Sequence, residues 1–167
     1  MAIKTVEDLR VKTEATWTKL SRQLEGLEPH LERSDAPGEW TAREVLSHLM
    51  FEPGWDPVAI LKKFSASDYP VIEIIPGNNY LNPERRAMSL KQLRDALEGQ
   101  KRAVFGYLDG LAAADLGRKA RIPLFKQVMG SDEVPIPAYV GALFGHHWND
   151  HAGQLAKIRK AAGLPEV

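Results

Sequence analysis

Four long segments of the chain carry apolar residues at intervals of three and four, and this spacing restricts the fold more than any other feature. An interval of three to four residues places side chains along one face of an α-helix. In the first segment, residues 5–27, these apolar positions are Val6, Leu9, Trp17, Leu20, Leu24 and Leu27. Because helices with one apolar stripe each pack most simply as a bundle, the pattern predicts an all-α, four-helix-bundle protein.

The second helix has the clearest start signal, in the stretch "WTAREV". Thr41 and Glu44 stand three residues apart, which is the spacing of a capping box, in which each side chain binds the backbone amide of the other residue. We expect this helix to run from Ala42 to about Glu52. Pro53 lacks a backbone N–H and clashes with the preceding turn, so a break is expected there.

The two remaining long helices are bounded by similar signals. Ser89 and Gln92 form a second candidate capping box, and the helix that follows is expected to end near Asp109. The last helix is expected over residues 137–162, with Gly163 as the glycine that commonly follows a helix end.

A long stretch without helical periodicity, residues 65–88, separates the second and third long helices. Just before it, Asp56 and Pro57 indicate a short additional helix, with Asp56 as N-cap and proline in the first turn. The piece "VIEII" could be extended, although an irregular crossover fits the stretch better. A second loop is expected over residues 111–136. We therefore expect residues 1–167 to form a single four-helix-bundle domain with a long crossover between helices 2 and 3, which allows these two helices to run parallel.

Composition argues against several classes of function. The 22 basic and 22 acidic residues cancel, whereas a nucleic-acid-binding surface needs a concentration of positive charge. No apolar run approaches the roughly 18 residues of a membrane span, and the start of the chain lacks the apolar core of a signal peptide. Cysteine is absent, which excludes thiolate ligands, disulfides and a cysteine nucleophile. We expect a cytoplasmic protein that binds neither nucleic acid nor membrane.

Residues with metal-binding chemistry are most concentrated in "HHWNDHAGQL", residues 146–155, which holds three of the five histidines. His147 and His151 are four residues apart, so they share one face of the last helix. Because that face is also the apolar stripe, both imidazoles are expected to point into the bundle. His146 lies about 100° around the helix from His147 and is expected at the edge of the apolar face.

His48, in the second helix, shares a face with apolar residues and is also expected to point inward. Three neutral imidazoles from two helices make a common catalytic metal set that leaves positions open for water or substrate. Glu52, one turn after His48, is a candidate fourth ligand or general base. Gln154 could hydrogen-bond a ligand or its water. The alternative is that the histidines are only hydrogen-bonded in the core.

The second helix begins with W-T-x-x-E-x-L-x-H-L, and H-x-x-x-H-x-x-Q follows on the last helix. This pair of motifs, together with the pattern of nearly the whole chain, resembles the DinB-like (DinB/YfiT) superfamily. The resemblance implies a four-helix bundle, a homodimer, and a divalent ion held by His48, His147 and His151, with zinc or nickel ahead of iron or manganese. It places Gln154 in a supporting position beside the ligands. The stretch "EPGWDP" departs from the family because it interrupts the second helix just past His48.

The resemblance implies a metal-dependent enzyme acting on a small-molecule substrate, either a hydrolase or a transferase or isomerase that uses a low-molecular-weight thiol. The ion would act as a Lewis acid that lowers the pKa of a bound water or thiol, and Glu52 is the candidate catalytic residue for proton transfer. The polar crossover piece "IPGNNYLNP" would line the substrate entrance or form an ordinary turn.

No HExxH, Walker, GxGxxG or GxSxG motif offers another catalytic template. Two alternatives stay open: a non-catalytic protein that binds metal or a small molecule, and a purely structural helical dimer.

Overall fold

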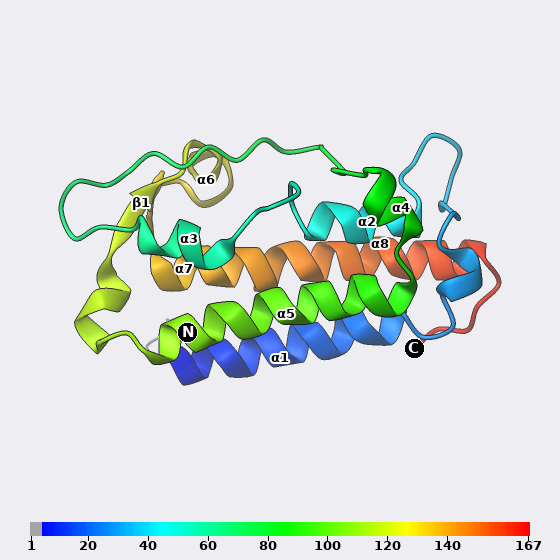
Figure 1. Ribbon diagram of the computed structural model, residues 1–167, viewed down its shortest axis with the longest axis horizontal. Coiled ribbons are helices and arrows are strands. Elements are labelled where there is room, and N and C mark those ends of the chain that lie inside the picture. The colour runs from blue at the N-terminus through cyan, green and yellow to red at the C-terminus, as the bar shows by residue number, and fades with distance from the viewer. Residues whose placement is uncertain (1–4) are drawn as a thin grey trace.

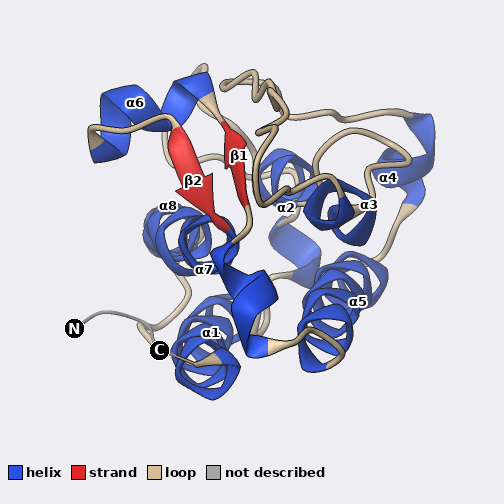
Figure 2. Ribbon diagram, turned by 90° about the vertical axis from the view of Figure 1, so that its left-hand side faces the viewer, coloured by secondary structure: helices blue, strands red, loops and turns tan. Residues whose placement is uncertain are grey.

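Four rows of helix run side by side in the computed structural model, which describes residues 5–167 (Figure 1). Seen along their axes, the rows occupy the corners of a bundle (Figure 2). The rows are formed by α1 (Val6–Gln23), by α2 (Ala42–Leu49) with α3 (Pro57–Lys62), by α5 (Leu90–Asp109), and by α7 (Ile136–Val140) continued through the π-helical segment Gly141–His146 into α8 (His147–Ala161). The four-helix bundle expected from the sequence is confirmed.

The crossover between α2 and α5 makes these two helices parallel. In Figure 1, α1 and α8 run from left to right, whereas α2 and α5 both run from right to left. The chain between α3 and α5 returns along the outside of the bundle, across the top of the same view. The long crossover expected between helices 2 and 3 is therefore present.

The helix starts follow the chemistry of their capping side chains. Thr41 Oγ1 accepts a hydrogen bond from the backbone amide of Glu44 at 3.2 Å, and Glu44 Oε2 accepts one from the amide of Thr41 at 2.8 Å. Ser89 and Gln92 form the same reciprocal pair at the start of α5. Asp56 caps α3, where its Oδ1 accepts two backbone amides. All three predicted caps are thus confirmed.

α2 is shorter than the sequence indicates. It ends at Leu49 rather than near Glu52, and Phe51 just beyond it has a left-handed φ of 59°. The physical reason is Pro53, whose ring would clash with the carbonyl group of Leu49 if the helix continued. The chain therefore leaves the helix about one turn before the proline.

The segments between the long helices contain short elements that periodicity does not reveal. They are α4 (Pro83–Ala87), β1 (Lys119–Arg121), α6 (Pro123–Met129), β2 (Glu133–Pro135) and the 3₁₀ turns Glu28–His30 and Ala113–Gly117. β1 and β2 are antiparallel, with Ala120 opposite Val134. Isolated bridges from Ser65 and Val71 attach the crossover to β1. The second loop expected over residues 111–136 is thus mostly structured.

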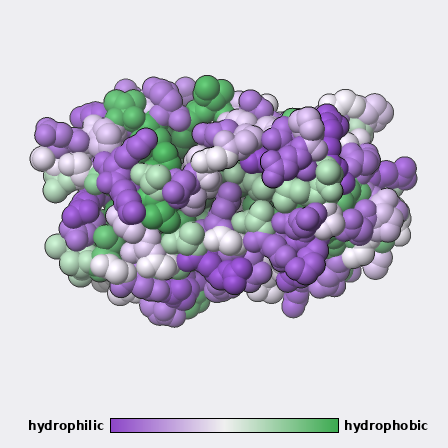
Figure 3. Space-filling model, in the orientation of Figure 1, coloured by the Kyte–Doolittle hydropathy of each residue, from purple (hydrophilic) through white to green (hydrophobic). Residues whose placement is uncertain are grey.

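The core lies between the four rows and continues beneath the short strands. Trp17 of α1 and Trp148 of α8 are both buried, with ring centroids 5.2 Å apart. On the face shown in Figure 3, the most hydrophobic residues gather over the half of the molecule that carries α3, β1 and α6. No helix within residues 5–167 is both long and apolar enough to cross a membrane.

Candidate metal centre

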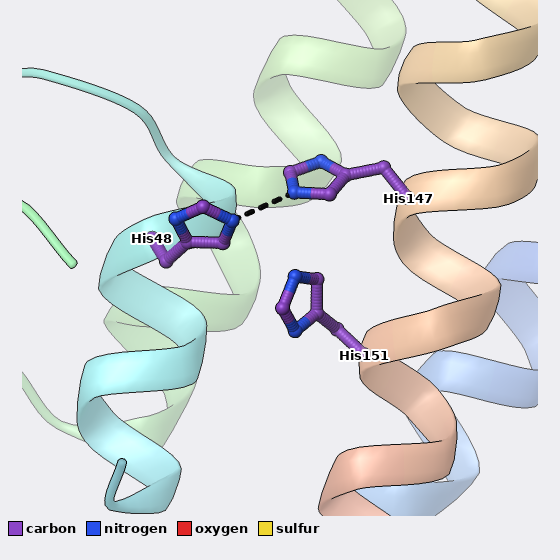
Figure 4. A group of neighbouring side chains, drawn as sticks. All are labelled: His48, His147 and His151. Atoms are coloured by element: carbon purple, nitrogen blue, oxygen red, sulfur yellow. Dashed lines mark hydrogen bonds between the residues drawn. The ribbon is translucent and has the colours of Figure 1, made fainter. Parts of the chain in front are cut away.

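Three histidines from two helices lie together inside the bundle (Figure 4). His48 belongs to the last turn of α2, whereas His147 and His151 lie in the first turns of α8. The Nε2 atoms of His48 and His147 are 2.8 Å apart, and one ring nitrogen from each histidine lies within 4.8 Å of the other two. Nitrogens that share a zinc ion at about 2.0–2.1 Å lie roughly 3.3 Å apart. The observed spacing therefore suits a common ion after small side-chain rotations.

A wide helical turn directly precedes the histidine pair on the last helix. The backbone amide of His147 donates to the carbonyl oxygen of Ala142, five residues earlier, which is the hydrogen bond of a π-helix. Such turns inside α-helices are frequent at functional sites. Beyond the wide turn, regular α-helix places His147 and His151 on one face, with ring centroids 4.8 Å apart.

His146 is separate from this group. Its side chain is exposed at a groove of about 980 Å³ that lies between α1 and the last helical row. Lys12, Thr16 and Gly141 also line the groove, whereas His48, His147 and His151 do not. The edge position expected for His146 is therefore confirmed.

Hydrogen bonds to oxygen acceptors fix the orientation of two of the three imidazoles, those of His48 and His151. His48 Nδ1 donates to the backbone carbonyl oxygen of Asn78 at 2.6 Å, and His151 Nδ1 donates to Oε1 of Gln154 at 2.8 Å. Both partners are oxygen acceptors, so each Nδ1 carries the proton and each Nε2 keeps its lone pair. An outer hydrogen bond of this kind is what a metal-ligating histidine normally has.

The surroundings of the three rings favour neutral imidazole. Burial, together with the neighbouring His151 and His48, lowers the pKa of His147 to about 3. Burial is also the main cause that lowers the pKa of His48 and of His151. Metal ligation requires the neutral form of histidine. The donor set therefore fits a divalent ion that accepts nitrogen ligands.

Aromatic side chains cover two sides of the histidine group. The Trp40 ring centroid is 4.9 Å from that of His48, and the Phe51 centroid is 5.5 Å from that of His147. Phe51 also stacks against Trp55 in the loop after α2. The sequence predicts Phe51 inside a helix that runs to about Glu52, whereas the helix ends at Leu49, so the position of Phe51 beside His147 was not predicted.

Glu52 lies apart from the three histidines. It is exposed in the loop after α2, and among the described residues the group able to hold a metal ion consists of His48, His147 and His151. Burial raises the pKa of the Tyr80 phenol, and the negative charge of Glu52 adds to this effect. Glu52 is thus close enough to the crossover to act on it electrostatically.

Asn78 was not identified from the sequence as a site residue, because its contact with His48 uses a backbone oxygen that every residue type possesses. The only signal is the polar stretch around it, "IPGNNYLNP". Asn79 in the same stretch donates from Nδ2 to Oε1 of Glu44 at 2.9 Å. The crossover is therefore attached to α2 both at its capping box and at His48.

Comparison with known proteins places this arrangement in a family. The family model of the DinB superfamily matches residues 12–155, a range that runs from α1 into α8 and contains all three grouped histidines. The chain belongs to the DinB superfamily. No curated protein sequence matches it significantly.

Three solved structures share the fold of this protein. YfiT from Bacillus subtilis, described as a probable metal-dependent hydrolase with an unusual four-helix bundle topology, has a TM-score of 0.73 at 15% identity, covering 99% of this chain and 91% of its own. A DinB-like protein from Bacillus cereus ATCC 10987 has a TM-score of 0.65 at 20% identity, covering 99% of both chains. An uncharacterised protein from Escherichia coli UTI89 has a TM-score of 0.60 at 18% identity, covering 99% of this chain and 98% of that one. The fold shared with these structures thus extends over essentially the whole of this protein.

Proposed function

We propose that this protein is a divalent-metal-dependent enzyme of the hydrolase type, with His48, His147 and His151 as the metal ligands. The observation that carries the proposal is the approach of three neutral imidazoles from two helices, one ring nitrogen of each lying within 4.8 Å of the others. The description of YfiT as a probable metal-dependent hydrolase supports the reaction class. Imidazole ligands favour zinc or nickel, with iron and manganese as alternatives.

The roles proposed for Asn78 and Gln154 follow from their contacts with the histidines. Asn78 and Gln154 hold the His48 and His151 rings through their Nδ1 atoms, which directs Nε2 toward the shared position. When bound, a divalent ion supplies Lewis acidity that polarises a substrate oxygen and lowers the pKa of a nucleophile. Glu52 is the proposed proton acceptor, because it is the first acidic residue after His48 and lies in the loop after α2.

Metal content of protein purified without a histidine tag tests the ligand set. We expect about one divalent ion per chain in the wild type, and loss of this ion in His48→Ala and His151→Ala. His146→Ala is the matched control, since this exposed neighbour is outside the group and its variant should retain the metal. Unchanged metal content in both ligand variants, with the fold intact by circular dichroism, would favour histidines that are only hydrogen-bonded in the core.

Turnover of p-nitrophenyl acetate by metal-free and metal-reconstituted protein tests the reaction class. We expect hydrolysis that depends on added zinc or nickel and that His147→Ala abolishes. Turnover only in the presence of a low-molecular-weight thiol would instead indicate a transferase or isomerase that uses this thiol. Tight metal binding without turnover of ester, amide or thiol substrates would indicate a non-catalytic metal-binding protein.

The expected homodimer and cytoplasmic location stay predictions. Sedimentation equilibrium of the wild-type protein measures the oligomeric state, and the expected molar mass is twice 18.6 kDa. Cell fractionation of the native host determines the location, and we expect the protein in the cytosolic fraction.

A further inference from the structure

Two aromatic residues in the loop after α2 form a stacked pair beside the histidine group. The ring centroids of Phe51 and Trp55 are 4.3 Å apart, and the ring planes differ by 24°. We call Phe51 and Trp55 the aromatic pair. Both side chains are only partly buried, so part of their surface stays accessible.

The local sequence explains how this pair forms. Between the two aromatic residues stands Glu52-Pro53-Gly54, and the amide of Trp55 donates to the carbonyl oxygen of Glu52 at 3.0 Å. Proline followed by a glycine with φ of 83° is the signature of a type II turn. This turn reverses the chain within four residues, which brings the Trp55 ring back onto the Phe51 ring.

Phe51 occupies a position where glycine is usual. Its amide donates to the carbonyl oxygen of His48 at 3.0 Å, and its φ of 59° is the left-handed conformation common after a helix end. A non-glycine residue in this conformation costs free energy, and such residues cluster at active sites and ligand clamps. Met50, just before it, is held by Gln100 Nε2, which donates to its carbonyl oxygen at 3.0 Å. The loop is thus anchored on α5 and presents the Phe51 ring at a conformational cost.

The direction of the Phe51 ring relates it to the site. Its centroid lies 5.5 Å from that of His147 and 6.4 Å from that of His48. Trp40 lies 4.9 Å from His48 and 6.4 Å from His151, on another side of the group. Of these two aromatic neighbours, Phe51 is the one extended by a second, partly accessible ring. A molecule that reaches the shared nitrogen position from this side therefore passes over apolar, planar surface.

We propose that the aromatic pair is a specificity-determining wall, which binds an apolar, planar group of the substrate next to the reacting atom. This inference rests on the proposed metal-dependent function, because it places the substrate beside the ion held by His48, His147 and His151. The pair offers no charged atom, so it selects by contact area and ring stacking. Such contacts distinguish an aromatic substituent from a methyl group by about three- to tenfold in affinity.

Two hydroxamates that differ only in this substituent test the proposal by equilibrium binding. Acetohydroxamate and benzohydroxamate both chelate metal, and only the second carries a ring. In zinc-loaded wild-type protein we expect benzohydroxamate to bind about three- to tenfold more tightly by isothermal titration calorimetry. Phe51→Gly and Trp55→Ala should bring this ratio close to one while leaving acetohydroxamate affinity and zinc content unchanged. Phe51→Gly keeps the fold because glycine suits the positive φ.

Tyr69→Ala is the matched control, since Tyr69 is a partly buried aromatic residue that contacts Lys119 of β1. This variant should keep the wild-type ratio. An affinity ratio near one in the wild type, or an unchanged ratio in both variants of the aromatic pair, would show that the pair does not determine specificity. A protein that takes up none of zinc, nickel, iron or manganese, and so binds neither probe, would overturn the proposed metal-dependent function and, with it, the proposed role of the aromatic pair.

Discussion

The side-chain oxygen Oε1 of Gln154 lies 2.8 Å from Nδ1 of His151 and accepts a hydrogen bond from it. The two residues are three positions apart on α8, so the helix itself sets their spacing. The contact leaves the Nε2 lone pair of His151 directed at His48 and His147. Gln154 therefore determines which nitrogen of His151 is available as a ligand.

Replacing this glutamine should weaken metal binding without removing a ligand. In Gln154→Leu, the His151 ring loses the acceptor that fixes its tautomer and orientation, so we expect zinc affinity to fall by about 10- to 100-fold. Competition with a chromophoric chelator measures this affinity. Gln154→Glu retains an acceptor at the same position and should stay near the wild-type value. Equal affinity in wild type and Gln154→Leu would show that the hydrogen bond does not support a ligand.

The metal-free protein should lose stability as the pH falls below about 6.5. His147 has a pKa of about 3 in the folded protein, against about 6.5 in the unfolded chain. Between these values only the unfolded chain binds the proton, so the free energy of unfolding decreases as pH decreases, by up to about 1.4 kcal/mol per pH unit from this residue. The full contribution is present above about pH 6.5. Urea unfolding across a pH series measures it, and His147→Gln should show a shallower slope than the wild type.

Arg85 should stabilise the crossover and, through it, the histidine site. Its side chain is buried, and Nη1 donates to the carbonyl oxygens of Ser47 at 2.9 Å and Tyr80 at 3.4 Å. In Arg85→Met these oxygens lose a charged donor, so we expect a loss of about 1–3 kcal/mol in the free energy of unfolding. Because the same crossover carries Asn78, zinc affinity should fall as well.

Arg86 is the matched control for this prediction, because it lies on the same short helix but is exposed. Arg86→Met should change stability by less than about 0.5 kcal/mol. Urea unfolding compares the two variants under the same conditions. Equal stability of both would show that the buried hydrogen bonds of Arg85 contribute nothing measurable.

Glu52→Gln should reduce turnover while leaving the metal in place. The substitution keeps the size of the side chain and removes its ability to accept a proton, and the histidine group does not include this residue. We expect kcat for p-nitrophenyl acetate hydrolysis to fall by about 100-fold or more, with unchanged zinc content. Wild-type turnover in this variant would exclude Glu52 as the proton acceptor.

Local signals in the sequence predicted the features that depend on residues close together in the chain. The capping pairs Thr41–Glu44 and Ser89–Gln92 mark real helix starts, because each pair satisfies its own backbone amides. His147 and His151 are four residues apart, about one helical turn, so they lie on one face of the helix.

Features that depend on partners distant in the chain cannot be predicted from local sequence signals. β1 and β2 are three residues each, too short for a periodic pattern, and their pairing spans α6. The backbone contact of Asn78 with His48 bridges thirty positions of chain and leaves no trace in side-chain identity. The left-handed conformation of Phe51 has no local marker in the sequence, because glycine, the usual marker of that conformation, stands instead at residue 54.

The π-helical segment Gly141–His146 bears on how relatives should be aligned. A π turn contains one residue more than an α turn, so it is the natural place for an insertion or deletion in the last helix. A homologue one residue shorter here could close the turn into ordinary α-helix and keep both imidazoles where they are. The number of residues between Pro137 and the histidines would then differ between homologues, whereas the histidines themselves would superpose. The H-x-x-x-H motif is therefore the anchor from which such alignments should be built.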